Sequence, residues 1–228
     1  MKTDLLNMFL RVIFCLMFMV FLINSSSATP STQIWNPSTD IQANKSWHLG
    51  IDNYFTIDGP LNGGYAFPTD IGLTYGVILG FEIGVDVFLP QTSPLSFNAK
   101  YGITEADNLP AIAIGGFGFG TQVGVTDQNV LYVIAAKTFI FGRISTGYFK
   151  GNPTLLGSDG FGMILTWDKS LTDKIWASID FASGNTTLGS LFAGFSYAFS
   201  KNTSVIFGYG TYSNGAKPTI TTQLDINI

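Results

Sequence analysis

The chain has 228 residues, of which only 11% are charged, whereas glycine occurs 26 times and phenylalanine 20 times. The surface of a water-soluble protein usually carries about a quarter or more charged positions, so much of this protein is expected to contact something other than water. The formal net charge of −4 disfavours nucleic acid as a partner, because proteins that bind nucleic acid neutralise phosphates with clustered basic residues.

Residues 1–28 have the three parts of a secretory signal peptide: Lys2 and Arg11, an apolar run over residues 12–23, and small polar residues before Ala28. The apolar run is well short of the roughly 20 residues that a membrane-spanning helix needs. We therefore expect export across a bacterial inner membrane and cleavage after Ala28. The remaining chain would have nine basic and fourteen acidic residues, a net charge of −5, and no cysteine.

Residues 29–45 come next and contain Pro30, Pro37 and several serines and threonines. They precede the first regular strand pattern. The sequence leaves two alternatives open for this segment, a periplasmic lead or a segment folded into the lumen of the domain that follows.

From residue 47 onward, hydropathy alternates with a period of two, which is typical of strands with one apolar and one polar face. In the first such segment, Leu49 and Ile51 share one face, and His48 and Asp52 share the other. The clearest strands are predicted at residues 47–57, 80–89, 95–104, 175–182 and 220–228. Further strands are predicted at residues 65–78, 111–121, 130–138, 140–150, 161–168, 188–199 and 203–211. Segments rich in glycine, proline, asparagine and aspartate separate them.

About twelve strands of roughly ten residues match the length that a tilted strand needs to cross a bilayer, and an even number suits antiparallel closure. A soluble β-sandwich would alternate as well. The polar faces, however, hold mainly small residues, and the chain has only two glutamates, Glu82 and Glu105. A solvated sheet face normally carries many long charged side chains. We therefore predict an all-β fold, a transmembrane antiparallel up-and-down β-barrel over residues 46–228.

Aromatic residues near the predicted strand ends suit the interfacial girdles of such a barrel. They are Trp35, Trp47, Tyr65, Tyr101, Tyr148, Trp167, Tyr197 and Tyr209.

The signal peptide, the short alternating strands and the alternating segment at residues 218–228 resemble those of small bacterial outer-membrane β-barrel proteins, an uncharacterised porin-like group. The resemblance covers residues 46–228. It implies a place in the outer membrane, contact with outer-membrane lipid, and insertion by the barrel-assembly machinery. Members commonly end in an aromatic residue that this machinery reads, whereas this sequence ends in Ile228.

Candidate chemistry is sparse. His48 is the only histidine, so serine–histidine or histidine–metal chemistry would have to involve it. Outer-membrane phospholipases and lipid A acyltransferases resemble the expected architecture, but none of their local motifs is found here. One histidine, no cysteine after Ala28 and scattered carboxylates give no metal-ligand spacing. We expect no enzyme activity, no cofactor and no metal.

The polar faces predict a charged lining of the lumen. Its members are His48, Asp52, Asp70, Glu82, Asp86, Lys100, Lys137, Arg143 and Asp180. Opposite charges across a lumen can form a salt-bridged plug or the constriction of a pore, and an excess of acids favours cations. A barrel closed by such pairs and by Tyr54, Phe88 and Trp176 agrees with the residues as well as a channel does.

The sequence therefore predicts a passive narrow channel for ions or small solutes, or a structural envelope protein. Two alternatives from other classes stay open. One is a lipid-modifying hydrolase or acyltransferase centred on His48, and the other is a secreted soluble β-sandwich that binds a partner.

Overall fold

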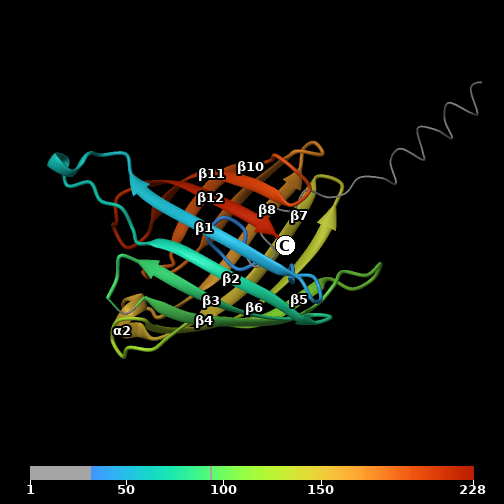
Figure 1. The fold of residues 1–228 in the computed structure, drawn as a ribbon, viewed down its shortest axis with the longest axis horizontal. Helices are drawn as coiled ribbons and strands as arrows, with labels where there is room; N and C mark the ends of the chain where they lie inside the picture. Colours follow the sequence, from blue (N-terminus) through green and yellow to red (C-terminus); the bar gives the residue numbers. More distant parts are fainter. Residues whose placement is uncertain (1–31, 93) are drawn as a thin grey trace, which may run out of the picture.

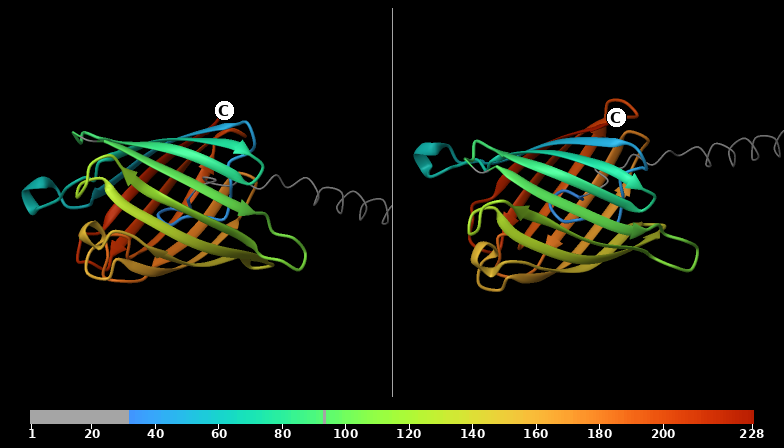
Figure 2. Two further views of the ribbon diagram at one scale, coloured as in Figure 1. Left: turned by 90° about the horizontal axis from the view of Figure 1, so that it is seen from below. Right: turned by 60° about the horizontal axis from the view of Figure 1, so that its bottom comes forward.

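The computed structural model describes residues 32–92 and 94–228, so the predicted signal peptide lies outside the described residues. Twelve strands form one closed antiparallel sheet, in which each strand pairs with its neighbours in the sequence and β1 closes on β12 (Figures 1 and 2). The strands are β1 (Trp47–Thr56), β2 (Thr69–Ile78), β3 (Phe81–Leu89), β4 (Leu95–Ile103), β5 (Ala111–Gly120), β6 (Asp127–Phe139), β7 (Gly142–Lys150), β8 (Phe161–Ser170), β9 (Ile175–Ala182), β10 (Ser190–Ala198), β11 (Thr203–Tyr212) and β12 (Thr219–Asn227). The predicted up-and-down barrel is confirmed, and a two-sheet sandwich is excluded because all these strands share one sheet.

Most strand ends lie within two residues of the predicted ones. Two strands differ more, since β2 begins at Thr69 and not at Tyr65, and β6 begins at Asp127 and not at Val130. The register between β5 and β6 shifts near Gly118, whose φ of 69° is left-handed, and this irregularity lets Phe119 pair with Asp127. A glycine tolerates this backbone geometry because it has no Cβ atom.

The two ends of the barrel differ in their connections. At one end, here called the turn end, the connections are residues 79–80, 104–110, 140–141, 171–174 and 199–202. At the other, here called the loop end, they are residues 57–68, 90–94, 121–126, 151–160, 183–189 and 213–218. The helical segments η1 (Pro60–Asn62) and α2 (Pro153–Leu156) belong to two loop-end connections. Within the described ranges, neither has the length and apolar character that crossing a membrane as a helix requires.

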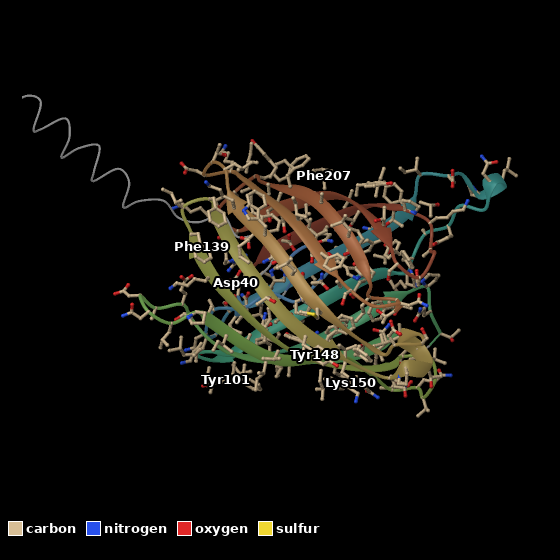
Figure 3. All side chains as sticks on the ribbon, turned by 180° about the vertical axis from the view of Figure 1, so that it is seen from behind. Asp40, Tyr101, Phe139, Tyr148, Lys150 and Phe207 are labelled. Carbon is tan, nitrogen blue, oxygen red and sulfur yellow. The ribbon has the colours of Figure 1, made fainter. Side chains whose placement is uncertain are left out.

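The barrel is apolar outside, and its interior combines many polar side chains with two buried apolar clusters around Phe149 and Phe192. Tyr101, Tyr148 and Phe207 project from the outer wall, whereas Asp40 lies within the barrel (Figure 3). Inward positions carry buried serines, threonines and charged residues, among them Glu82 and Lys100. A transmembrane barrel requires this distribution, because lipid replaces the opposing protein layer on its outer face.

Replacing an outward leucine at mid-strand by lysine tests whether lipid covers this face. For Leu165→Lys in β8 we expect the free energy of unfolding from lipid vesicles to fall by about 2–4 kcal/mol, the cost of lysine near the bilayer midplane. The matched control is Leu61→Lys in η1, an exposed loop-end position that should change little. Equal effects of the two substitutions in urea titrations would contradict a lipid-covered wall.

Candidate functional site in the barrel lumen

A segment of the chain itself occupies the lumen. Residues 32–42, here called the plug, run inside the barrel ahead of β1 (Figures 1 and 2). Four of its side chains are fully buried, namely those of Gln33, Ile34, Ser38 and Gln42. After the plug, Lys45 N–H donates to the carbonyl oxygen of Gly76 in β2 at 2.7 Å, which ties the segment to the wall before β1 begins.

Asp180 of β9 anchors the first turn of the plug. The backbone N–H groups of Ile34, Trp35 and Asn36 all donate to its Oδ2 atom, at 3.1, 2.8 and 3.0 Å. The side-chain amide of Asn36 donates to the Oδ1 atom. Consecutive N–H groups that converge on one oxygen form an anion-binding nest, and the negative charge strengthens each hydrogen bond. Within the described part of the chain, the plug supplies the hydrogen bonds that compensate this buried carboxylate.

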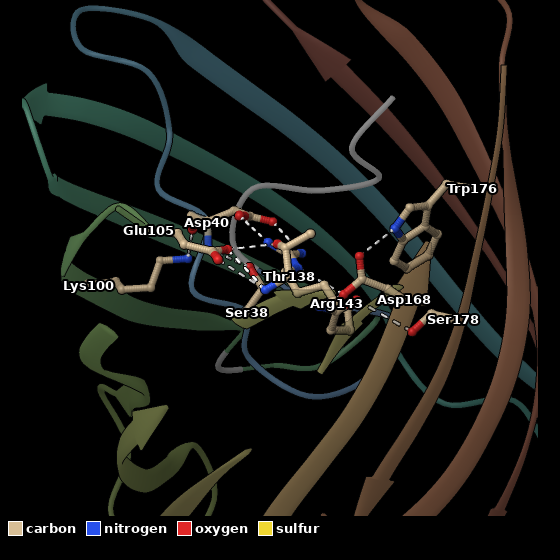
Figure 4. Close-up of polar contacts among 10 residues, drawn as sticks. Ser38, Asp40, Lys100, Glu105, Thr138, Arg143, Asp168, Trp176 and Ser178 are labelled. Carbon is tan, nitrogen blue, oxygen red and sulfur yellow. Dashed lines mark hydrogen bonds and ion pairs between the residues drawn. The ribbon is translucent and has the colours of Figure 1, made fainter. Parts of the chain in front are cut away.

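A second anchor is ionic and lies farther along the plug (Figure 4). Arg143 of β7 binds both carboxylate oxygens of Asp40, at 2.6 and 2.8 Å, and its Nε atom donates to Asp168 of β8 at 2.9 Å. This bidentate geometry is the strongest form of arginine–carboxylate contact. Arg143 thus joins the plug to the barrel wall through two carboxylates.

Lys100 of β4 and Glu82 of β3 hold the last part of the plug. Their side chains pair at 3.2 Å, and both are almost fully buried. Lys100 also donates to the backbone carbonyl of Asp40, and Glu82 accepts from the backbone N–H of Gln42 at 2.5 Å. A buried ion pair needs such additional hydrogen bonds to offset the loss of water, and here the plug backbone supplies them.

Trp35 seats the plug against aromatic side chains of the wall. Its ring stacks on Phe192 with 5.3 Å between centroids, and meets the edges of Tyr54 and Tyr212 at 5.0 and 5.6 Å. The expectation that Trp35 belongs to an interfacial girdle is therefore wrong. It precedes the strands, so no strand register could place it on the outer face.

The structure places most of the predicted lumen residues inside the barrel, in two groups. Glu82, Lys100, Arg143 and Asp180 contact the plug. His48, Asp52, Asp70 and Asp86 form the second group on the wall around β1.

Lys137 requires a correction. It shares the outward face of β6 with Leu131 and Val133, and its Nζ atom lies 3.0 Å from Glu105 in the turn-end connection 104–110. The inward face of β6 carries Ile134 and Ala136, both buried. Sequence reasoning assigned the wrong register because β6 is apolar on both faces.

Sequence reasoning missed three residues of the lumen wall, Asp168, Asp225 and Gln223. Asp168 is the last residue of the predicted strand 161–168, but β8 continues to Ser170 and the Trp176 indole donates to Asp168 at 3.1 Å. Asp225 and Gln223 lie on the polar face that the alternation at residues 220–228 indicates. The signal for both was therefore present in the sequence.

His48 is buried against β12. Its Nε2 atom lies 3.4 Å from Asp225 Oδ1, and its Nδ1 atom lies 3.2 Å from Asn227 Oδ1. Among the described residues, neither ring nitrogen contacts a serine hydroxyl, so the structure offers no histidine-activated nucleophile of the kind that a serine hydrolase uses. Residues 32–92 and 94–228 also hold no group of three histidine, cysteine or acidic side chains placed to bind a metal ion.

This chain is similar to known proteins in its three-dimensional structure. No protein-family model matches the sequence, and no curated protein matches it. A solved KdgM porin superposes with a TM-score of 0.52 at 12% sequence identity, over 79% of this chain and 97% of the porin. A KdgM porin in complex with disordered oligogalacturonate gives 0.50 at 11% identity with the same coverage. The chain therefore has the fold of a small porin barrel.

The hydrogen bonds to Asp180 predict that removing its carboxylate makes the first turn of the plug more mobile. In Asp180→Ala, amide hydrogen exchange of Ile34, Trp35 and Asn36 should accelerate by about tenfold or more, because loss of charged hydrogen bonds costs more than the 1.4 kcal/mol that corresponds to tenfold. Ser178→Ala, which removes only a 3.4 Å contact to Gln33, is the matched control. Unchanged exchange in a folded Asp180→Ala barrel would show that the plug is held by other contacts.

Glu105, in the turn-end connection 104–110, should make the stability of the folded barrel depend on pH. Hydrogen bonds from Thr138 and Lys137 lower the pKa of Glu105 from 4.5 to about 2. The folded state therefore prefers the ionised carboxylate, and its stabilisation is complete above about pH 4.5 and is lost as the pH falls towards 2.

The stability difference between the wild type and Glu105→Gln should follow this profile in unfolding measurements across that range. Asp107→Asn, which removes an exposed carboxylate of the same connection, should change the stability at neutral pH less than Glu105→Gln does. A difference that persists unchanged to pH 2 would rule out the assignment.

Proposed function

We propose that this protein is an outer-membrane barrel that acts as a narrow passive channel, with its own N-terminal plug as the closing element. The observation that carries the proposal is the chemistry inside the barrel. The lumen holds a polar chain segment that is bound through Asp180, Arg143, Lys100 and Glu82. Two apolar clusters of inward side chains, around Phe149 and Phe192, lie beside these contacts. If this segment moves, the part of the wall that bound it presents the charged side chains of Asp180, Arg143, Lys100 and Glu82 to the lumen.

The proposal includes location and orientation. An apolar outer wall of strands eight to thirteen residues long suits contact with outer-membrane lipid. Bacterial barrels have short periplasmic turns and longer external loops, so the turn end faces the periplasm and the loop end the exterior. Export through the predicted signal peptide and insertion by the barrel-assembly machinery complete this proposal.

The charge of the lumen indicates which solutes would pass. The KdgM porin complex contains oligogalacturonate, an acidic saccharide. In this chain only two basic side chains, Lys100 and Arg143, are described in the lumen. The acidic side chains described there are Asp40, Asp52, Asp70, Glu82, Asp86, Asp168, Asp180 and Asp225. Ions and small neutral solutes suit this channel better than acidic oligosaccharides do.

The function is tested by electrical recording from planar bilayers that contain the refolded full chain. Arg143→Gln removes the bidentate contact to Asp40, and each 1.4 kcal/mol lost from plug binding should raise the open fraction about tenfold. We expect a conductance increase of at least this size. Lys217→Gln, which removes one cation and one ion pair from an exposed loop-end site, is the matched control and should behave as the wild type.

A further variant lacking residues 32–42 removes the whole plug. If insertion is verified and the wild type, Arg143→Gln and the plug deletion all leave the membrane silent, the channel proposal fails. The barrel would then be a structural envelope protein.

A further inference from the structure

One part of the lumen wall carries negative charge without a basic partner. Asp52 of β1 lies directly opposite Asp70 of β2, and Asp86 of β3 lies opposite Gly72, two residues farther along β2. These three aspartates are called the acidic group below. Within the described residues, no lysine or arginine forms an ion pair with the acidic group.

The lumen's basic side chains are engaged elsewhere. Lys100 pairs with Glu82, and Arg143 pairs with Asp40 and Asp168. Asp86 accepts one hydrogen bond, from Asn98 at 2.8 Å. The acidic group therefore faces a part of the lumen whose charge the protein itself leaves uncompensated.

Some side-chain oxygen atoms in and next to the acidic group also have no hydrogen-bond donor among the described residues. Asp52 Oδ1, Asp70 Oδ1 and Gln223 Oε1 are buried and have no hydrogen-bond partner among the described residues. Gln223 of β12 is fully buried and lies directly opposite Asp52. Buried acceptors of this kind are costly unless a donor or a cation satisfies them.

The orientation of the Gln223 amide is fixed by its neighbours. Its Nε2 atom donates to Tyr54 Oη and to the carbonyl oxygen of Ile34, at 2.7 Å each. A flipped amide would place Oε1 against that carbonyl, so the observed orientation is the favourable one. Gln223 Oε1 consequently makes none of these contacts, and on the residue directly opposite Asp52 it offers a neutral oxygen that lacks a donor among the described residues.

The plug leaves space in front of this wall. Gly50 of β1 and Gly72 of β2 lie opposite each other, and a Cβ atom added at Gly50 would have only His48 Nε2 and Asp52 Oδ1 within 4 Å. At other positions, residues that precede β1 pack closely against the barrel wall. A Cβ atom would lie 3.0 Å from Ile34 at Gly194, and would clash with the Ala43 carbonyl at Gly76.

We propose that Asp52, Asp70 and Asp86, with Gln223 Oε1, form a binding site for small hydrated cations in the open part of the lumen beside the plug. Carboxylate and amide oxygens are the ligands that hard cations prefer, and grouped aspartates give channels their cation selectivity. The described residues hold no three acidic side chains close enough to chelate a bare metal ion. The cation therefore keeps part of its water shell, as a permeating ion must. This inference rests on the proposed channel for its selectivity but not for its binding.

The test compares two triple variants of the full chain in lipid. Asp52→Asn/Asp70→Asn/Asp86→Asn removes the charge of the acidic group with little change of shape. Asp107→Asn/Asp159→Asn/Asp173→Asn, the loop variant, removes three exposed carboxylates from connections between strands. Circular dichroism and thermal unfolding establish that both variants form the barrel.

The first readout is ion binding, with calcium chloride as the probe and choline chloride at equal ionic strength as the control salt. Calcium should raise the thermal midpoint of the wild type and of the loop variant more than choline does, and this increment should vanish in the acidic-group variant. An equal increment in all three proteins overturns the site. This readout needs no current, so it separates the site from the channel proposal.

The second readout is the reversal potential in a potassium chloride gradient. Wild-type current, or the current of Arg143→Gln, should prefer potassium over chloride, and the permeability ratio should fall several-fold in the acidic-group variant only. Current without cation preference overturns the site as a selectivity element while the channel stands. Calcium binding without current in any variant supports the site and overturns the channel.

Discussion

Burial of charge inside a closed barrel is the constraint on which the rest of this structure depends. A barrel of twelve strands encloses more space than its inward side chains fill, and most of those side chains are polar. Buried carboxylates and cations are tolerated only when they are paired or hydrogen bonded. The plug supplies those partners, since its backbone N–H groups surround Asp180 and its Asp40 carboxylate meets Arg143.

The plug does not compensate the lumen evenly. Its contacts with glutamate, lysine, arginine and aspartate side chains lie on β3, β4 and β7 to β9, and its contacts with Tyr54, Phe192, Tyr212 and Gln223 lie on β1 and β10 to β12. At Gly50 and Gly72, the inward positions of β1 and β2 carry no side chain, and the neighbouring aspartates form no ion pair with a lysine or arginine among the described residues. The acidic group therefore lies beside the part of the lumen that the plug occupies, as the proposed cation site requires.

Anchoring by hydrogen bonds and ion pairs also suits a segment that moves. If the plug were held only by apolar contacts, moving it would expose a large apolar area to water, at a cost proportional to that area. Polar contacts such as Arg143 to Asp40 can be exchanged for water, which a wet lumen provides. The apolar part of the attachment is a buried cluster in which Ile34 and Trp35 of the plug pack with Phe192 and its neighbours, and it gives the plug a defined position.

The sequence by itself determined the barrel. The two-residue period is a local property of strands, so it placed all twelve of them, and the alternation put Glu82, Lys100 and Asp180 on the polar faces. It misplaced Lys137, because β6 is apolar on both faces and leaves the register open. Only the tertiary structure decided what fills the lumen. The contacts of Trp35, Asn36 and Asp40 with Asp180 and Arg143 join residues more than a hundred positions apart, and no local period encodes such pairs.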